Sequence, residues 1–474
     1  MQMLFHPGHG RAADFIPFYW KGRYHLFYLR VFDDLTNRSE GTPWHQVVSR
    51  DFVNFADWGE AIPCGADGAQ DVWIFTGSVV ERNGEFLAFY TAHNRHMREK
   101  GKPTECVALA RSKDLRRWKK EPSLRIFPPV EAGYEAHDWR DPFIYWDERC
   151  GEWGMLLAAR NDRGPSRHRG CTALLTSPDM KSWTRRQPFW APDQYQTHEC
   201  PDLFKIGRWW YLVYSTFSES CITHYRMSRS LSGPWRAPKN ADGGDSFDGR
   251  AYYAAKTAGD GKRRYAFGWL PTREDRKDDG KWHWGGTLVV HEIAQQPDGT
   301  LTVRIPRSVA GAFKKKRRSV LRPLVGIWRK RGAAICADAA GRFSAASLGK
   351  LPDCTLIEAT VRFNSGTENA GLLLRADAAM EKYYQLRIEP LRQRIVIDRW
   401  PRPGDVPFML ERPLRLRAGE PVRLRVLLDD SCMVAYANDK VALSCRLYEH
   451  RAGELGVFVT NGRAEFSSLS LKER

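Results

Sequence analysis

The chain repeats one local pattern five times, and this repeat constrains the fold more than any other feature of the sequence. In each copy, a glycine or basic turn is followed by a short strand rich in aromatic and aliphatic residues. The copies span residues 22–28, 84–90, 151–157, 207–214 and 262–269. Their starts are separated by about 55 to 67 residues, a period typical of propellers and other repeat arrays.

A second marker recurs in phase with the first. The frame Ser-x-Asp-x-x-x-aromatic occupies residues 49–55, 112–118 and 177–183, and a degenerate copy lies at 230–235. The frame predicts a tight turn in which Ser or Asp accepts hydrogen bonds from nearby backbone, with the aromatic residue packed between sheets. Each unit then reads as one four-stranded blade. Five units predict a five-bladed β-propeller over residues 1–305.

The pattern changes after residue 305. Residues 306–331 lack the repeat and contain the basic run Lys314–Arg318, which is typical of a solvated linker. Residues 332–474 alternate apolar and polar residues with regularly spaced turns, which predicts an antiparallel β-sandwich of accessory type. The predicted fold class is therefore all-β, with a propeller, a linker and a sandwich in that order.

Charge and cysteine usage narrow the choice of partners. The net charge is +18, but Lys and Arg are spread along the chain, so we expect no nucleic-acid partner. No secretory leader is visible and no apolar run approaches about 18 residues, so we expect no membrane partner. The ten cysteines form no CxxC pair or Cys/His cluster, which favours reduced cysteines and a cytoplasmic location.

Three acids lie in phase with the repeat. Asp14 and Glu199 each precede a glycine turn by eight positions, and Asp141 precedes one by ten. The innermost strands of a propeller converge on its channel, so these carboxylates are expected to meet at one mouth. Mutual repulsion predicts that at least one of them holds its proton near neutral pH. A carboxylate paired with a carboxylic acid is what glycosidic cleavage requires.

Several short motifs, in the right order along nearly the whole chain, resemble those of glycoside hydrolase family 32, the β-fructofuranosidases. Trp139–Pro142 is similar to that family's Arg-Asp-Pro motif, and His198–Pro201 is similar to its Glu-Cys motif. Weaker likenesses cover residues 75–78, 252–256, 282–286 and 428–438.

The resemblance implies a retaining mechanism that needs no cofactor and no metal. It implies Asp14 as nucleophile, Glu199 as acid/base and Asp141 as transition-state stabiliser, with Arg140 as its orienting neighbour. It further implies a sugar subsite lined by Trp44, Phe75, Ser78, Tyr253 and Trp284.

The first motif departs from the family pattern Asn-Asp-Pro-Asn-Gly, because the chain reads Ala12-Ala13-Asp14-Phe15-Ile16. This departure leaves the substrate open among sucrose, a difructose and fructo-oligosaccharides. The alternatives are an inverting family 43-like hydrolase of arabinan or xylan fragments, a fructosyltransferase, and a non-catalytic sugar-binding propeller. The sequence favours a small saccharide as partner and leaves the oligomeric state unknown.

Overall fold

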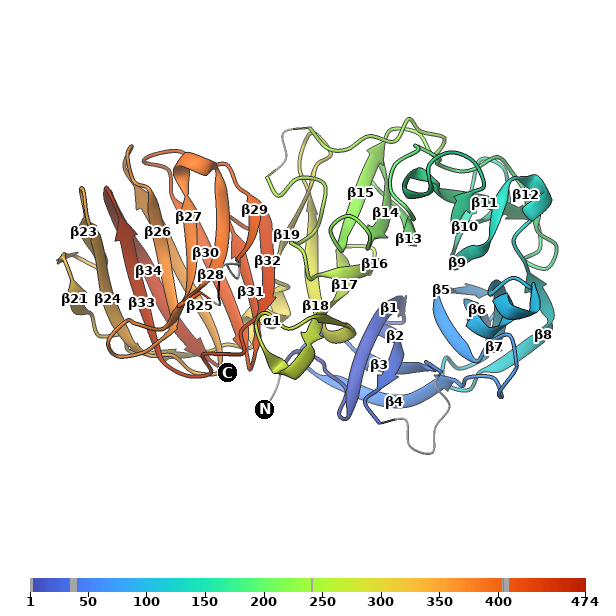
Figure 1. Ribbon diagram of the computed structural model, residues 1–474, viewed down its shortest axis with the longest axis horizontal. Helices are drawn as coiled ribbons and strands as arrows, with labels where there is room; N and C mark the ends of the chain where they lie inside the picture. The colour runs from blue at the N-terminus through green and yellow to red at the C-terminus, as the bar shows by residue number, and fades with distance from the viewer. Residues whose placement is uncertain (1–2, 35–40, 240–241, 403, 405–408) are drawn as a thin grey trace.

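A computed structural model describes residues 3–34, 41–239, 242–402, 404 and 409–474 (Figure 1). These residues form six sheets whose strands pair antiparallel, which confirms the all-β prediction. The helical segments are short: η1 (Arg95–Lys100), η2 (Val130–Ala132), η3 (Ser166–His168), η4 (Glu274–Arg276), α1 (Arg307–Gly311) and η5 (Pro390–Arg392).

Four sheets are built from residues 10–304. The largest has the order β16-β17-β18-β1-β2-β3-β4, with β19 beside β18. Its strands are β1 (Gly10–Trp20), β2 (Arg23–Phe32), β3 (Trp44–Ser49), β4 (Phe55–Ile62), β16 (Tyr253–Gly259), β17 (Arg264–Arg273), β18 (Trp282–Gln295) and β19 (Leu301–Arg304).

The other three sheets follow the chain order. The first comprises β5 (Trp73–Arg82), β6 (Glu85–His93), β7 (Glu105–Ser112) and β8 (Lys119–Ile126). The second comprises β9 (Tyr134–Asp147), β10 (Glu152–Asn161), β11 (Gly170–Ser177) and β12 (Thr184–Arg185). The third comprises β13 (Glu199–Ile206), β14 (Trp209–Thr216) and β15 (Ile222–Ser228).

These four sheets are arranged around a common centre, with β1, β5, β9, β13 and β16 nearest to it (Figure 1). Within the eight-stranded sheet, β1 meets β18 at the single residue pair Ala12–Gly286, so two four-stranded groups are joined at one point. The division of this ring into five blades stays a prediction.

The Ser-x-Asp frames form the predicted turns. Ser49 accepts a hydrogen bond from the backbone N–H of Phe52 at 2.8 Å, and Asp51 accepts from Asn54 at 2.8 Å. Both bonds recur at residues 177–182. At residues 112–117, Asp114 accepts from Arg117 in the same way, and Ser112 accepts from the backbone N–H of Asp114. In each turn the residue after Asp has a positive φ and a buried side chain, which anchors the turn in the core.

The remaining strands form two sheets around a shared apolar core. One has the order β22-β23-β34-β25-β30-β31-β32, with β20 beside β34, and the other has the order β21-β24-β33-β26-β27-β28-β29. Buried side chains from both sheets belong to one cluster, among them Leu424 and Leu428 of the first and Leu372 and Leu374 of the second.

The strands that build these two sheets are 3 to 11 residues long. The first sheet contains β20 (Lys315–Arg317), β22 (Ile327–Arg331), β23 (Ala334–Asp338), β25 (Cys354–Phe363), β30 (Val422–Asp429), β31 (Cys432–Ala437), β32 (Val441–Arg446) and β34 (Arg463–Glu473). The second contains β21 (Arg322–Val325), β24 (Phe343–Lys350), β26 (Asn369–Ala376), β27 (Tyr383–Glu389), β28 (Arg394–Trp400), β29 (Met409–Pro413) and β33 (Glu454–Thr460).

The segment predicted as a linker carries regular structure. Residues 306–331 include α1, and they continue into β20, β21 and β22, which pair with strands of the two C-terminal sheets. The sequence prediction missed these strands because exposed Lys and Arg replace the alternation that marks the other strands. These three strands therefore belong to the sheets that follow, and the domain boundaries stay a prediction.

The two groups of sheets share a continuous junction. Leu427, Val434 and Tyr436 belong to the same apolar cluster as the strands of the N-terminal sheets. Arg446 donates hydrogen bonds to the backbone oxygens of Leu270 and Pro271 across this junction, each at 3.1 Å. The C-terminal sheets therefore support the β17–β18 hairpin, which contributes to the site described next.

Candidate active site

The five strands nearest the centre all carry a β-bulge at the same level. The pairing of β1, β5, β9, β13 and β16 with the next strand shifts register near Asp14, Thr76, Asp141, Cys200 and Ala254. Four of these residues have a positive φ: Asp14 at 43°, Asp141 at 62°, Cys200 at 50° and Ala254 at 49°. A bulge bends a strand and redirects its side chains, so the repeat itself positions the acids.

Asp14 is buried and accepts two hydrogen bonds. Thr76 Oγ1 donates to its Oδ2 at 2.8 Å, and Trp269 Nε1 donates to its Oδ1 at 2.9 Å. Burial raises the pKa of Asp14 from 3.8 to about 6; the two donors oppose this shift, and the nearby charge of Glu199 adds to it. Asp14 is therefore poised to exchange its proton in the physiological range.

Asp141 lies on β9 beside the bulge of β13. The backbone N–H of Cys200 donates to its Oδ2 at 2.8 Å, and its own N–H donates to Thr91 Oγ1 at 2.7 Å. Burial raises the pKa of Asp141 to about 7, Arg140 opposes the shift, and Glu199 adds to it. The predicted proton-holding acid is thus best matched by Asp141, with burial rather than repulsion as the main cause.

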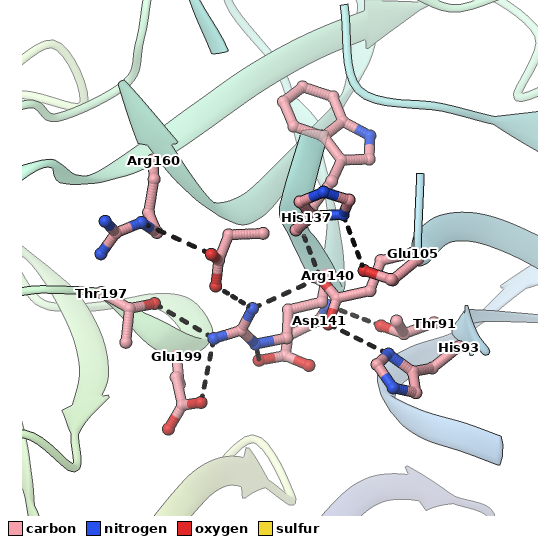
Figure 2. A network of polar contacts seen from close by, with 12 residues as sticks. Thr91, His93, Glu105, His137, Arg140, Asp141, Arg160, Thr197 and Glu199 are labelled. Atoms are coloured by element: carbon pink, nitrogen blue, oxygen red, sulfur yellow. Dashed lines mark hydrogen bonds and ion pairs between the residues drawn. The ribbon is translucent and has the colours of Figure 1, made fainter. Parts of the chain in front are cut away.

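Glu199 begins β13 and is held by two donors. Arg140 Nη2 donates to its Oε1 at 3.1 Å, and the hydroxyl of Tyr253 donates to its Oε2. Figure 2 shows Arg140 between Glu199, Asp141 and Glu105. Arg140 also lies 3.9 Å from an Asp141 oxygen, 3.3 Å from a Glu105 oxygen and 2.5 Å from an Asp138 oxygen. One guanidinium therefore contacts four carboxylates.

Further contacts bring Asp14 to the same place. Cys200 Sγ lies 3.8 Å from Thr76 Oγ1, the donor to Asp14. The ring of Tyr253, which binds Glu199, packs edge-on against Trp269, the other donor to Asp14, with centroids 5.5 Å apart. The structure therefore gathers Asp14, Asp141 and Glu199, as the repeat predicts.

The predicted sugar-subsite residues differ in how available they are. Trp44 is fully buried, and its Nε1 donates to the backbone oxygen of Phe75 at 3.0 Å. The hydroxyl of Ser78 is engaged with the backbone of β9, donating to Pro142 O at 2.9 Å. These contacts place both residues in the packing between sheets, and their assignment to a subsite stays a prediction.

Phe75 and Trp284 are more accessible. Trp284 is 39% exposed, and its ring lies edge-on to Phe75 with centroids 5.7 Å apart. Phe75 also stacks on His93 at 4.5 Å. An aromatic pair of this kind offers an apolar face to a sugar ring, and the role of both residues stays a prediction.

Four residues of the site were not singled out from the sequence: Thr76, Trp269, Glu105 and Lys256. Thr76 and Trp269 lie inside motifs that the sequence does show, and those motifs were the available signal. Lys256 is buried, and its Nζ donates to Pro201 O at 2.8 Å. Glu105 carries no motif, and only the folded chain brings it to Arg140.

The chemistry of the site is that of carboxyl groups and their donors. Within the described ranges, no group of three or more His, Cys, Asp or Glu residues is arranged to hold a metal ion. None of the helices in that same part of the chain has the length and apolar character needed to cross a membrane. Two aspartates and a glutamate that meet near the centre of a ring of sheets match the carboxyl groups that glycosidic cleavage requires.

The chain belongs to glycosyl hydrolases family 32. The family's N-terminal domain matches residues 15–301, and its C-terminal domain matches residues 337–473. The first match begins one residue after Asp14, where the chain departs from the family's first motif. Membership of family 32 removes the basis for the family 43-like alternative.

Individual relatives are distant. A levanbiose-producing levanase from Bacillus subtilis (strain 168) is 29% identical over 274 residues, covering 55% of this chain and 46% of that protein. The chain thus aligns with about half the length of the levanase. A sucrose-6-phosphate hydrolase from Escherichia coli is 23% identical over 471 residues, covering 94% of this chain and 88% of that protein.

Solved structures share the fold. Fructan 1-exohydrolase IIa from Cichorium intybus in complex with 1-kestose superposes with a TM-score of 0.76 at 17% identity, covering 99% of this chain and 97% of that one. This likeness extends over both groups of sheets.

Proposed function

We propose that this chain is a retaining glycoside hydrolase that releases terminal β-fructofuranosyl units from a small fructoside. The observation that carries the proposal is the convergence of Asp14, Asp141 and Glu199, which lie on three of the five bulged strands nearest the centre. Family membership supports the reaction class, and the 1-kestose bound to the Cichorium intybus enzyme supports a sugar as substrate.

In the proposed mechanism, ionised Asp14 attacks the anomeric carbon of the fructosyl unit. Glu199 donates its proton to the leaving oxygen, and the glycosidic bond breaks as the bond to Asp14 forms. Glu199 then takes a proton from water, which attacks the covalent intermediate and releases Asp14. Hydrogen bonds from Arg140 and Tyr253 fix the orientation of Glu199 during both steps.

Asp141 has a different proposed role. Its pKa of about 7 lies above the value of about 6 for Asp14, so Asp141 is protonated while Asp14 is ionised only between these two values. Asp141 would bind sugar hydroxyls and stabilise the positive charge that develops in the transition state. Arg140 contacts the carboxylates of both Asp141 and Glu199 and so fixes their relative positions.

We infer the substrate range and the architecture on the same basis. Sucrose, a difructose and short fructo-oligosaccharides are the candidate substrates. The altered surroundings of Asp14 do not identify which leaving group the site accepts. We propose that residues 1–305 form a five-bladed catalytic propeller and that the C-terminal sheets form an accessory sandwich. Ten free cysteines support the proposal of a cytoplasmic location.

The test compares Glu199→Gln with wild type on sucrose and on a nitrophenyl fructofuranoside. Loss of the acid should lower kcat/KM on sucrose by about 10²–10⁴-fold, and far less on the activated substrate, whose leaving group needs no proton. Glu219→Gln, at an exposed glutamate, is the matched control and should keep full activity. Equal losses on both substrates would contradict the acid role.

The stereochemistry of the first product tests retention separately. NMR of fresh product should show β-fructofuranose before mutarotation. Net inversion would contradict the covalent intermediate while leaving the hydrolase assignment intact.

A further inference from the structure

The segment from Lys314 to Arg331 holds an unusual share of the positive charge. Nine of its residues are Lys or Arg and none is Asp or Glu, against a net charge of +18 for the whole chain. All nine side chains are exposed. We call this segment the basic strip; its cations are Lys314, Lys315, Lys316, Arg317, Arg318, Arg322, Arg329, Lys330 and Arg331.

The basic strip borders both C-terminal sheets. Strand β20 pairs with the end of β34, while β21 and β22 are the terminal strands of their respective sheets. In Figure 1, β21 lies at the end of the molecule farthest from the ring of N-terminal sheets. The strip therefore extends from β20, which pairs with the C-terminal end of β34, to β21 at that far end of the molecule.

Few of these cations are neutralised within the described part of the chain. Arg317 forms an ion pair with Glu473, and Arg322 forms one with Glu454 at 2.8 Å. The other seven form no ion pair with a described acid. Concentrated, unneutralised cations attract an anionic partner and repel one another without it.

Exposed aliphatic side chains interrupt the cations and narrow the choice of partner. Val320 is 62% exposed, Val325 is 46% exposed and Ile327 is 61% exposed. Aliphatic groups gain free energy by entering the acyl boundary of a bilayer, whereas a hydrated polyanion offers them no such contact. The aromatic residue of the strip, Trp328, is 9% exposed, so no ring is presented for stacking on nucleic-acid bases.

A hollow of about 710 Å³ adjoins the strip at β22. Its cationic lining comes from Arg329, Arg331 and Arg342, together with Arg362 and Arg463, while Asp338 and Glu465 are its acids. Guanidinium groups bind phosphate oxygens bidentately, so this hollow suits the phosphodiester of a lipid headgroup.

We propose that the basic strip is a peripheral contact surface for an anionic lipid bilayer. The cations meet the headgroup phosphates, and the three aliphatic side chains enter the interface beside them. The sequence expectation of no membrane partner rested on the lack of a long apolar run, which a surface contact does not need. The proposal does not depend on the catalytic assignment.

The test is co-sedimentation of the full chain with vesicles of phosphatidylglycerol and phosphatidylcholine in equal parts, against vesicles of phosphatidylcholine alone. Binding should occur with the anionic vesicles and weaken as salt is added. The variant Lys315→Gln/Lys316→Gln/Arg329→Gln/Lys330→Gln should bind at least about tenfold more weakly. The matched control replaces four exposed lysines of the N-terminal sheets by Gln and should bind as wild type: Lys102, Lys113, Lys181 and Lys262.

A second variant separates lipid from other partners. Val320→Ser/Ile327→Ser keeps every charge and should weaken vesicle binding, while unchanged binding would reduce the strip to a general polyanion site and overturn the proposal. Lack of wild-type binding, or equal loss in the control, would also overturn it. So would a dimer in sedimentation that the same charge substitutions dissociate, since a second copy would then cover the strip. Unfolding temperatures matching wild type show that the variants are folded.

Discussion

Buried carboxylates occupy two regions of this molecule, the candidate active site and the junction between the two groups of sheets, and their surroundings differ. At the junction, Asp248 accepts from His291 at 2.9 Å and from the backbone of Gly249 and Ser444 at 2.6 and 2.9 Å. At the site, Asp14 accepts from two donors and lies near another acid. The carboxylates of both regions are buried, but Asp248 accepts more hydrogen bonds than Asp14 does.

The pKa values follow this difference. Burial alone would raise the pKa of Asp248, but hydrogen bonds from His291 and Ser444 and the charge of Arg412 hold it below its ordinary value. Burial raises the pKa of Asp14 to about 6 because its donors do not outweigh it. A buried carboxylate that accepts enough hydrogen bonds to stay ionised contributes to stability. One with fewer donors is available for proton exchange and nucleophilic attack.

The largest expected effect is the loss of activity in Asp14→Asn. Without a nucleophile, kcat/KM on the best fructoside should fall by at least about 10⁴-fold. The amide removes a buried charge, so the unfolding temperature at pH 7 should stay level or rise. Steady-state assays and thermal unfolding check both. An active variant would remove Asp14 from the mechanism.

At the junction we expect the opposite effect of removing a buried carboxylate: Asp278→Ala should lower stability. Asp278 is fully buried, accepts from Tyr384 at 2.6 Å and pairs with Arg399 at 3.1 Å. Its removal leaves the buried Arg399 with only the exposed Glu449, 3.3 Å away, as an acidic partner. The free energy of unfolding should fall by about 3–5 kcal/mol. Its exposed neighbour is the matched control, since Asp279→Ala should change stability by less than about 0.5 kcal/mol. Denaturant unfolding measures both.

The sequence predicts the site better than the junction, for a physical reason. Asp14, Asp141 and Glu199 stand in phase with the repeat, so strand geometry alone brings them together. Asp248 and Asp278 reach partners in the C-terminal sheets, such as Ser444 and Tyr384, more than 100 residues away. A repeat along the sequence cannot predict contacts between residues so far apart in the chain.

The same limit applies to details of the site. The sequence shows the motif that contains Thr76 but not the bulge that points its hydroxyl at Asp14. The sequence gives no sign of the role of Glu105, because its partner Arg140 comes from a different sheet. The pairing of Asp248 could not be predicted for the same reason. The exposed basic strands β20 to β22 do not show the alternation of apolar and polar residues that predicts a strand, since neither face of such a short strand is strongly apolar.

The pH dependence of stability provides a sharper test of the comparison. Because the folded-state pKa of Asp14 is raised from 3.8 to about 6, its contribution to stability is full below pH 3.8 and is lost as pH rises through 6. The change amounts to about 3 kcal/mol for this group, since each pKa unit is about 1.4 kcal/mol. Asp14→Asn should remove it, so the stability difference between variant and wild type should grow in the variant's favour from pH 4 to pH 7. A constant difference would contradict the raised pKa.

The smallest expected effect concerns Lys256, a buried cation beneath the acids. Its Nζ donates to Pro201 O, and its charge lowers the pKa of Asp14. In Lys256→Met that influence is lost, so the acidic limb of the kcat/KM profile should move to higher pH and the value at pH 6 should fall by a factor of about two to five. Lys262→Met, at an exposed lysine of the same β16–β17 hairpin, should leave the profile unchanged. A merely structural lysine would lower stability without moving the limb, so the displacement of the pH profile distinguishes an electrostatic role at the site from a packing role like that of the junction residues.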